Sequence, residues 1–121
     1  MKILVVDDNE DFCENLKDIL ELHSYTVLTA YNALKALDLV ETESPQLVIM
    51  DIVMPGMDGA AAISRIRRLS PQAPVLVTTA FAREELVSRA LHEGAFAYIR
   101  KPVDFDQLLT IIKEIEESLQ G

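Results

Sequence analysis

The sequence is poor in cysteine, in aromatic residues and in glycine. Its 121 residues include one cysteine, Cys13, no tryptophan and only 6% aromatic residues. A single cysteine excludes a disulfide framework, so an apolar core has to hold the fold together. Half of the residues are hydrophobic, and a chain of this length can bury such a core as one unit. We therefore expect one domain over residues 1–121, with Cys13 packed inside it.

Basic residues are also scarce. Lysine and arginine number 11 against 20 aspartates and glutamates, which gives a formal net charge of −9. A surface this acidic repels the phosphates of nucleic acids and of anionic lipids, so we expect no direct nucleic-acid partner and no membrane partner. The same surface attracts cations and basic protein surfaces.

Long hydrophobic runs are absent as well. No stretch approaches the length of a membrane span. The apolar run nearest the start, residues 3–6, ends at Asp7 and Asp8 and is too short for a secretory signal. Together with the low cysteine content, this favours a cytoplasmic protein.

Five short apolar runs alternate with segments of helical periodicity. The runs cover residues 2–7, 25–29, 47–50, 74–79 and 96–99. Unbroken apolar runs are typical of parallel strands buried on both faces. The strict alternation predicts an α/β protein, a single doubly wound (βα)5 domain with helices on both faces of a five-stranded parallel sheet. The second run is more polar and predicts an edge strand, which favours the flavodoxin-like strand order 2-1-3-4-5.

Polar side chains stand where the expected strands end. Asp7 and Asp8 follow the first strand, Asp51 the third, Thr79 the fourth and Lys101 the fifth. Because the carboxyl ends of parallel strands meet at one edge, these side chains should converge at the crevice where the strand order reverses. Pro55, Gly56 and Gly59 mark a loop directly after Asp51.

The expected convergence has a defined chemistry. Three carboxylates packed together repel one another unless a cation joins them. Oxygen ligands without a nearby histidine or cysteine favour Mg²⁺. A metal ion, an ammonium and a hydroxyl around one carboxylate can handle a phosphoryl group, with Asp51 as the nucleophile. Thr78 competes with Thr79 for the hydroxyl role, and the following Ala80 favours Thr79.

Four motifs occur in order at specific spacings. They are Val6-Asp7-Asp8, Asp51 with Met54-Pro55-Gly56-Met57-Asp58-Gly59, Thr79-Ala80, and Tyr98 three residues before Lys101-Pro102. In these residues the chain resembles a receiver domain of the two-component response regulators, over essentially its whole length. The resemblance implies a phosphorylation-activated signalling switch and not an enzyme in the usual sense.

The resemblance also implies how phosphorylation takes place. Asp51 would accept a phosphoryl group from a phosphohistidine on a sensor histidine kinase or a histidine phosphotransfer protein. Asp8 and Asp51 would bind Mg²⁺ directly with the backbone carbonyl of Val53, and Asp7 would hold it through water. The domain would assist its own phosphorylation and its slow dephosphorylation.

The switch residues follow from the same resemblance. Lys101 would pair with Asp51 and then with a phosphoryl oxygen, aimed by a cis bond to Pro102. Thr79 would bond another phosphoryl oxygen, and Tyr98 would swing inward behind it, although Tyr98 also fits a half-buried strand aromatic. The altered face would be that of the fourth helix, fifth strand and fifth helix, which would control an output domain or an effector protein.

Two apolar residues depart from the polar pattern found in many receivers. Val53 and Phe81 lie two residues beyond Asp51 and Thr79, so neither side chain can hold a hydrolytic water. We therefore expect slow self-dephosphorylation. Ile111 and Leu119 add apolar surface to the last helix, and we expect phosphorylation-promoted homodimers through that face.

Three other functions fit the expected fold. A flavodoxin-like cofactor binder would need a phosphate cradle after the first strand, where residues 7–11 are mostly acidic and repel phosphate. A haloacid-dehalogenase-like phosphatase would need a second acid at Val53. A degenerate receiver that acts only as a docking or dimerisation module would not need the intact set of Asp7, Asp8, Asp51, Thr79 and Lys101.

Overall fold

The computed structural model describes residues 1–80 and 83–120, in which strands and helices alternate. The strands are β1 (Lys2–Val6), β2 (Thr26–Ala30), β3 (Leu47–Asp51), β4 (Val75–Thr79) and β5 (Ala97–Arg100). The helices are α1 (Glu10–Leu22), α2 (Ala33–Glu43), α3 (Gly59–Leu69), α4 (Glu84–His92) and α5 (Phe105–Gln120). The predicted element order is confirmed, with strand boundaries shifted by about one residue.

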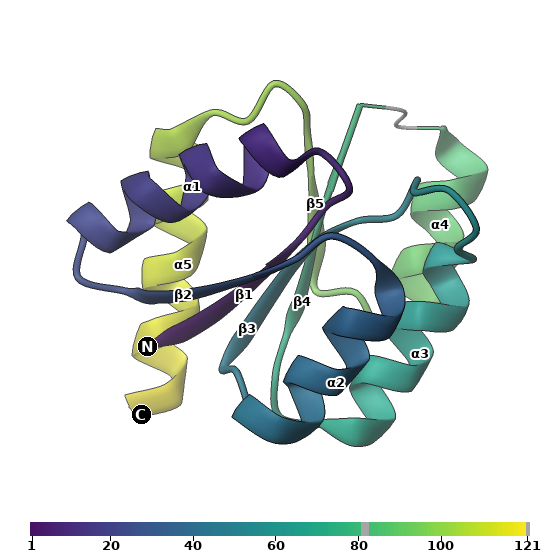
Figure 1. Cartoon of the computed structure of the whole chain (residues 1–121), viewed down its shortest axis with the longest axis horizontal. Coiled ribbons are helices and arrows are strands. Elements are labelled where there is room, and N and C mark those ends of the chain that lie inside the picture. Colours follow the sequence, from purple (N-terminus) through teal and green to yellow (C-terminus); the bar gives the residue numbers. More distant parts are fainter. Residues whose placement is uncertain (81–82, 121) are drawn as a thin grey trace.

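The strands form one parallel sheet in the order β2-β1-β3-β4-β5 (Figure 1). This confirms the predicted α/β class and strand order, with the more polar β2 at an edge. The order reverses direction between β1 and β3, which are direct neighbours. The carboxyl ends of β1, β3, β4 and β5 therefore lie side by side at one edge of the sheet.

Alternating side chains divide the core into two layers. On one face Leu4 and Val6 belong to a core shared with α2, α3 and α4. On the other face Ile3 and Val5 belong to a core shared with α1 and α5, which includes the fully buried Cys13. Figure 1 shows the same division, with α1 and α5 on one side of the sheet. Both faces are covered, which explains why the strands are nearly continuous apolar runs.

Helices begin soon after the strand ends because polar residues cap them. Asn9, Asn32 and Asp58 each accept a hydrogen bond from the backbone N–H three residues later, with distances of 3.0, 2.8 and 3.2 Å. The side chain of Asp104 accepts from the N–H groups of Asp106 and Gln107 at the start of α5. Such caps satisfy backbone donors that have no partner inside the helix. They keep the loops at the carboxyl edge short.

Gly59 lets the loop after β3 turn tightly into α3. A Cβ atom at this position would lie 2.5 Å from the carbonyl oxygen of Ile52 and 2.8 Å from its Cβ. Backbone atoms this close cannot move aside without shifting the segment that follows Asp51. The glycine is therefore required by a close approach of two backbone segments.

Replacing Gly59→Ala should lower the free energy of unfolding by about 1–3 kcal/mol, the usual cost of overpacking a close contact. Urea denaturation would measure the change. The exposed neighbour Ala61 offers a matched control, since Ala61→Ser should alter stability by less than about 0.5 kcal/mol. Equal stability of the Gly59 variant and the unchanged protein would show that the contact relaxes without cost.

Thr78 places a side-chain hydroxyl in the core. Its side chain is fully buried, and its hydroxyl has no hydrogen-bond partner within residues 1–80 and 83–120. Strand alternation places Thr78 on the face of Leu76, which packs in the layer of α1 and α5. A buried hydroxyl of this kind costs free energy because its bonds to water are lost.

Removing this hydroxyl should stabilise the protein. Thr78→Val is expected to raise the free energy of unfolding by about 1 kcal/mol, since an unpaired buried polar group costs about 1–3 kcal/mol. The reciprocal Val77→Thr variant buries a new hydroxyl in the same strand and should be less stable than the unchanged protein. Urea denaturation of both variants measures the effect, and a less stable Thr78→Val variant would contradict the prediction.

Candidate functional site

Three carboxylates meet at the carboxyl edge of the sheet. Asp7 and Asp8 directly follow β1, and Asp51 is the last residue of β3. One carboxylate oxygen of each residue lies within 4.8 Å of the others. Asp7 and Asp51 are buried, whereas Asp8 is exposed. The structure therefore brings together the three acidic residues that the sequence pointed to.

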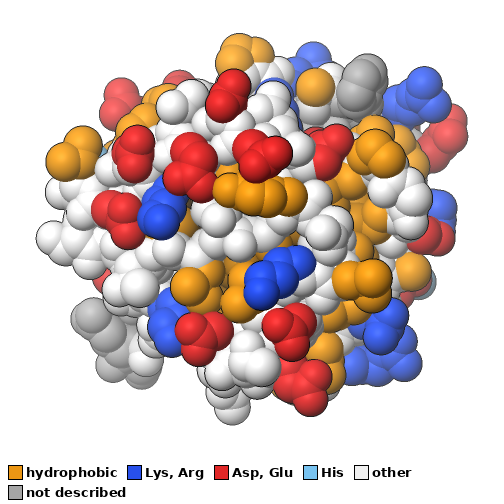
Figure 2. Space-filling view, in the orientation of Figure 1, with side chains coloured by type: hydrophobic (Ala, Val, Ile, Leu, Met, Phe, Trp, Pro, Cys, Tyr) orange, Lys and Arg blue, Asp and Glu red, His pale blue; other side chains and the backbone are white. Residues whose placement is uncertain are grey.

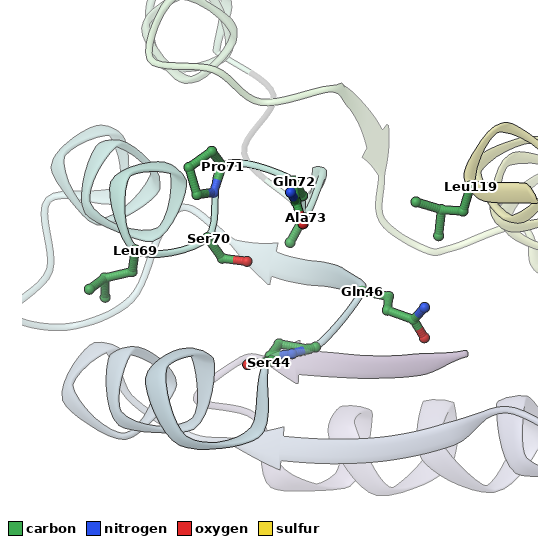
Figure 3. A pocket seen from close by; sticks show the side chains of 9 residues that line it. Ser44, Gln46, Leu69, Ser70, Pro71, Gln72, Ala73 and Leu119 are labelled. Carbon is green, nitrogen blue, oxygen red and sulfur yellow. The ribbon is translucent and has the colours of Figure 1, made fainter.

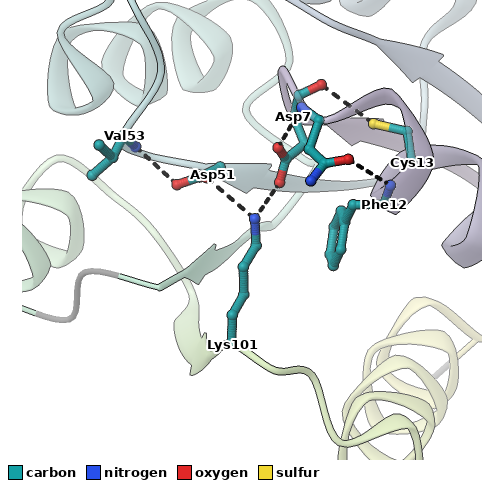
Figure 4. Close-up of polar contacts among 7 residues, drawn as sticks. Asp7, Phe12, Cys13, Asp51, Val53 and Lys101 are labelled. Atoms are coloured by element: carbon teal, nitrogen blue, oxygen red, sulfur yellow. Dashed lines mark hydrogen bonds and ion pairs between the residues drawn. The ribbon is translucent and has the colours of Figure 1, made fainter.

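Lys101 lies between the two buried carboxylates (Figure 4). Its Nζ is 2.5 Å from Oδ2 of Asp7 and 3.3 Å from Oδ2 of Asp51. The backbone N–H of Lys101 donates to the carbonyl of Thr79 at 2.9 Å, which ties the end of β5 to β4. The bond to Pro102 is cis, as the resemblance implies. The pairing with Asp51 that the resemblance implies is present, and Lys101 lies closer still to Asp7, a contact that the resemblance did not imply.

The remaining oxygens of the two buried carboxylates accept backbone hydrogen bonds. Oδ1 of Asp7 accepts from the N–H of Asn9 at 2.9 Å, and Oδ1 of Asp51 accepts from the N–H of Val53 at 2.9 Å. Both bonds span two residues and form the same kind of local turn directly after a strand. Each strand end thus orients its own carboxylate toward Lys101.

Burial and charge shift the pKa values of the central pair. Burial raises the pKa of Asp51 above its ordinary value, assisted by the charge of Asp7 and opposed by the Val53 N–H and by Lys101. Burial alone would lower the pKa of Lys101, but its hydrogen bond to Asp7 and the charge of Asp51 raise it above its ordinary value. Lys101 therefore stays a cation, and ionised Asp51 is more basic than an ordinary aspartate.

The donor set of the cluster fits a hard divalent cation. Three carboxylates face one ammonium, so negative charge is left uncompensated. Only oxygen ligands are present in the cluster, and exposed Asp8 leaves room for water, which Mg²⁺ usually retains. Acidic side chains also gather over α1 (Figure 2), so the surrounding surface attracts cations.

The other residues predicted for the site, Thr79 and Tyr98, lie in β4 and β5. Thr79 is the last residue of β4 and is fully buried, while its neighbour Thr78 pairs with Asp51 in the sheet register. Tyr98 lies inside β5, 44% exposed, and lines a groove with α4 residues such as Val87 and Leu91. It therefore belongs to the α4–β5 surface. Phe81 lies outside the described residues.

The structure also brings Phe12 to the site, which the sequence did not indicate. Helical spacing assigns Phe12 to the apolar stripe of the first helix, but the Nζ of Lys101 lies 4.3 Å from the centroid of its ring. Nothing in the sequence links residue 12 with residue 101, because the contact forms only where the Lys101 side chain, after the end of β5, meets the first turn of α1.

Cys13 is packed beneath Asp7 and is not a reactive group. Its Sγ lies 3.4 Å from the backbone oxygen of Asp7, and it is fully buried, as predicted. Burial, with a smaller contribution from the charge of Asp7, raises the pKa of the thiol to about 12. A thiol that stays protonated is a poor nucleophile and metal ligand.

A separate hollow lies at the opposite edge of the sheet, before β3 and β4 (Figure 3). It is lined by Ser44, Pro45, Gln46, Leu69, Ser70, Pro71, Gln72, Ala73 and Leu119. None of these side chains is ionisable, so the hollow offers no acid, base or metal ligand. The acidic edge is therefore the candidate functional site.

Among the described residues no helix is both long and apolar enough to cross a membrane.

Comparison with known proteins agrees with this geometry. The family model described as the response regulator receiver domain matches residues 3–113. The transcriptional regulatory protein ZraR of Salmonella typhimurium is 42% identical over 106 residues, which cover 88% of this chain. The chain spans about a quarter of the length of that relative (24%).

Two solved structures show the same fold over 99% of this chain. A CheY-like response regulator receiver domain protein from Methanospirillum hungatei is 34% identical, with a TM-score of 0.91 over 99% of this chain and 98% of that one. A response regulator from Burkholderia pseudomallei, solved with a phosphorylated aspartic acid, a calcium ion and citrate, is 30% identical, with a TM-score of 0.86 over 99% of this chain and 74% of that one. Receiver domains are signalling domains of two-component systems, and this chain belongs to the response regulator receiver domain family.

Proposed function

We propose that this chain is a phosphorylation-activated signalling switch with Asp51 as the phosphoacceptor. The observation that carries the proposal is the position of Lys101, whose ammonium bridges Asp51 and Asp7 beside the exposed Asp8. The similar Burkholderia protein holds a phosphorylated aspartic acid and a calcium ion. That pairing of a modified aspartate with a divalent ion supports the same use of the acidic edge in this chain.

The proposed reaction transfers a phosphoryl group from a phosphohistidine to Asp51. A carboxylate oxygen of Asp51 attacks phosphorus, a P–O bond forms, and the P–N bond breaks. The imidazole leaves with the electron pair of that bond and takes up a proton. Little covalent chemistry falls to the protein in such a transfer, so positioning and charge neutralisation do most of the work.

Asp8 and Asp51, with the backbone carbonyl of Val53, would hold Mg²⁺ directly, and Asp7 would hold it through water. This division is supported by the contacts of Asp7, whose two oxygens already accept from Asn9 and Lys101. A bound Mg²⁺ supplies positive charge beside the phosphoryl oxygens. Burial raises the pKa of Asp51, so its ionised form is a better nucleophile than an ordinary aspartate.

Phosphorylation would then move Lys101 and Thr79. The ammonium of Lys101 would bond a phosphoryl oxygen, and the hydroxyl of Thr79 would bond another. Tyr98 would turn inward from its half-exposed place beside α4, which changes the α4–β5–α5 face. Added negative charge at the carboxyl edge of the sheet would thereby alter the α4–β5–α5 surface, to which a partner binds.

The proposed phosphoryl transfer and surface change imply two kinds of partner. The phosphoryl donor would be a sensor histidine kinase or a histidine phosphotransfer protein in the cytoplasm. The phosphorylated domain would in turn control an output domain or an effector protein. The homodimer through α5 stays a prediction. Leu119 is 47% exposed and could join such an interface, whereas Ile111 is half-buried against the core.

Asp51→Asn should abolish phosphorylation. After incubation with acetyl phosphate and Mg²⁺, intact-protein mass spectrometry should show one added phosphoryl group on the unchanged protein and none on the variant. The exposed α2 residue Asp38 provides a control, because Asp38→Asn should be modified like the unchanged protein. A chelator should also suppress the modification. Equal modification of the Asp51 variant would exclude Asp51 as the acceptor, and no modification of the unchanged protein would favour a docking module.

The phosphorylated protein should lose its phosphoryl group slowly. The side chain of Val53, 37% exposed beside Asp51, cannot orient a hydrolytic water. Val53→Asn should accelerate hydrolysis about fivefold, the effect of one hydrogen bond of about 1 kcal/mol in the transition state. Loss of radiolabel from the purified phosphoprotein measures both rates. A lifetime of seconds in the unchanged protein would contradict the prediction, as would an unchanged rate in the variant.

A further inference from the structure

The aromatic ring of Phe12 is the least expected neighbour of Lys101. The ammonium lies 4.3 Å from the ring centroid, inside the distance of about 6 Å at which a cation is attracted to the electron-rich face of a ring. Phe12 is half-buried at the border of the α1–α5 core. Its ring therefore joins an apolar layer of the protein to the charged group of the site.

Phe12 also belongs to a closed circuit of contacts around Asp7. The N–H of Asn9 donates to Oδ1 of Asp7 at 2.9 Å, and the side chain of Asn9 accepts from the N–H of Phe12 at 3.0 Å. The Phe12 ring contacts the ammonium of Lys101, and this ammonium donates a hydrogen bond to Oδ2 of Asp7. Figure 4 shows Phe12 and Asp7 both turned toward the Lys101 ammonium. The first turn of α1 is thus aligned with the lysine through Asp7.

An aromatic face suits a lysine that has to change partners. Hydrogen bonds from Nζ to Asp7 and Asp51 are directional and break when the ammonium turns to another acceptor. Attraction to a ring face depends little on where the three N–H groups point. Phe12 can therefore hold the ammonium both before and after Nζ exchanges one hydrogen-bond acceptor for another. Without the ring, the flexible lysine side chain would sample other conformations during the exchange.

We propose that Phe12 is a positioning residue for Lys101, whose ring face retains the ammonium at the phosphoacceptor edge while its hydrogen-bond acceptors are exchanged. The assignment rests on the proposed function of Asp51 and Lys101. It gives the first turn of α1 a role in phosphoryl binding that apolar packing alone does not include.

Beryllofluoride, which mimics a phosphoryl group on aspartate, tests the assignment in the whole chain at saturating Mg²⁺. Phe12→Leu keeps an apolar side chain but removes the ring, and should weaken the apparent affinity for beryllofluoride by about two- to thirtyfold, the range of a cation–π contact. Phe12→Tyr should retain the affinity of the unchanged protein. Phe96→Leu removes an exposed ring at the opposite edge of the sheet and serves as the matched control.

Two further measurements separate attraction to the ring from packing. A trifluorinated phenylalanine at position 12 keeps the shape of the ring but weakens its negative face, so it should fall between Phe and Leu. In a Lys101→Ala background, Phe12→Leu should have no additional effect, because a positioning residue acts only through its target. NMR of the unchanged protein should show the Lys101 ε-methylene protons shifted upfield by the ring.

The outcomes distinguish the two levels of the proposal. No beryllofluoride binding by the unchanged protein would overturn the proposed function itself. Normal binding by the unchanged protein and by Phe12→Leu would overturn only the role of Phe12. Full affinity with the fluorinated ring, or an equal loss in the Lys101→Ala background, would assign Phe12 to packing and overturn its positioning role. The fluorinated variant keeps the test valid if Phe12→Leu does not fold.

Discussion

The ammonium of Lys101 between Asp7 and Asp51 is the interaction on which the rest of the site depends. Two buried carboxylates this close repel each other, and each loses hydration that costs several kcal/mol per ion. A buried cation offsets part of that cost only in the right geometry. Such an arrangement is poor at stabilising a fold. In the proposed function, a phosphoryl group and a divalent ion would change how these charges are compensated.

The scaffold holds these charges with local features that have simple causes. Each carboxylate is oriented by a backbone N–H two residues further on, so a strand end and its own turn determine where the oxygens point. Helix caps at Asn9 and Asp58 keep the next helix close, and Gly59 permits the close approach of α3 to Ile52. Apolar layers cover both faces of the sheet, so the polar side chains gather at its carboxyl edge.

The two edges of the sheet divide the molecule chemically. The carboxyl edge carries the cluster of Asp7, Asp8, Asp51 and Lys101, whereas the hollow at the opposite edge is lined by apolar and neutral polar side chains. Tyr98 lies in β5 and lines a groove with residues of α4. In the proposed function this side chain would relate phosphorylation at the acidic edge to the α4–β5 surface.

The sequence by itself determined the fold class, the strand order and the acidic cluster, because unbroken apolar runs and the polar residues at their ends are local signals. The topology brings those strand-end residues to one edge. Only the tertiary structure decided that Lys101 lies closer to Asp7 than to Asp51, that the Thr78 hydroxyl is without a partner among the described residues, and that Phe12 faces Lys101. These contacts join residues far apart in the chain, and their distances depend on how α1, β4 and β5 pack, which no local pattern encodes.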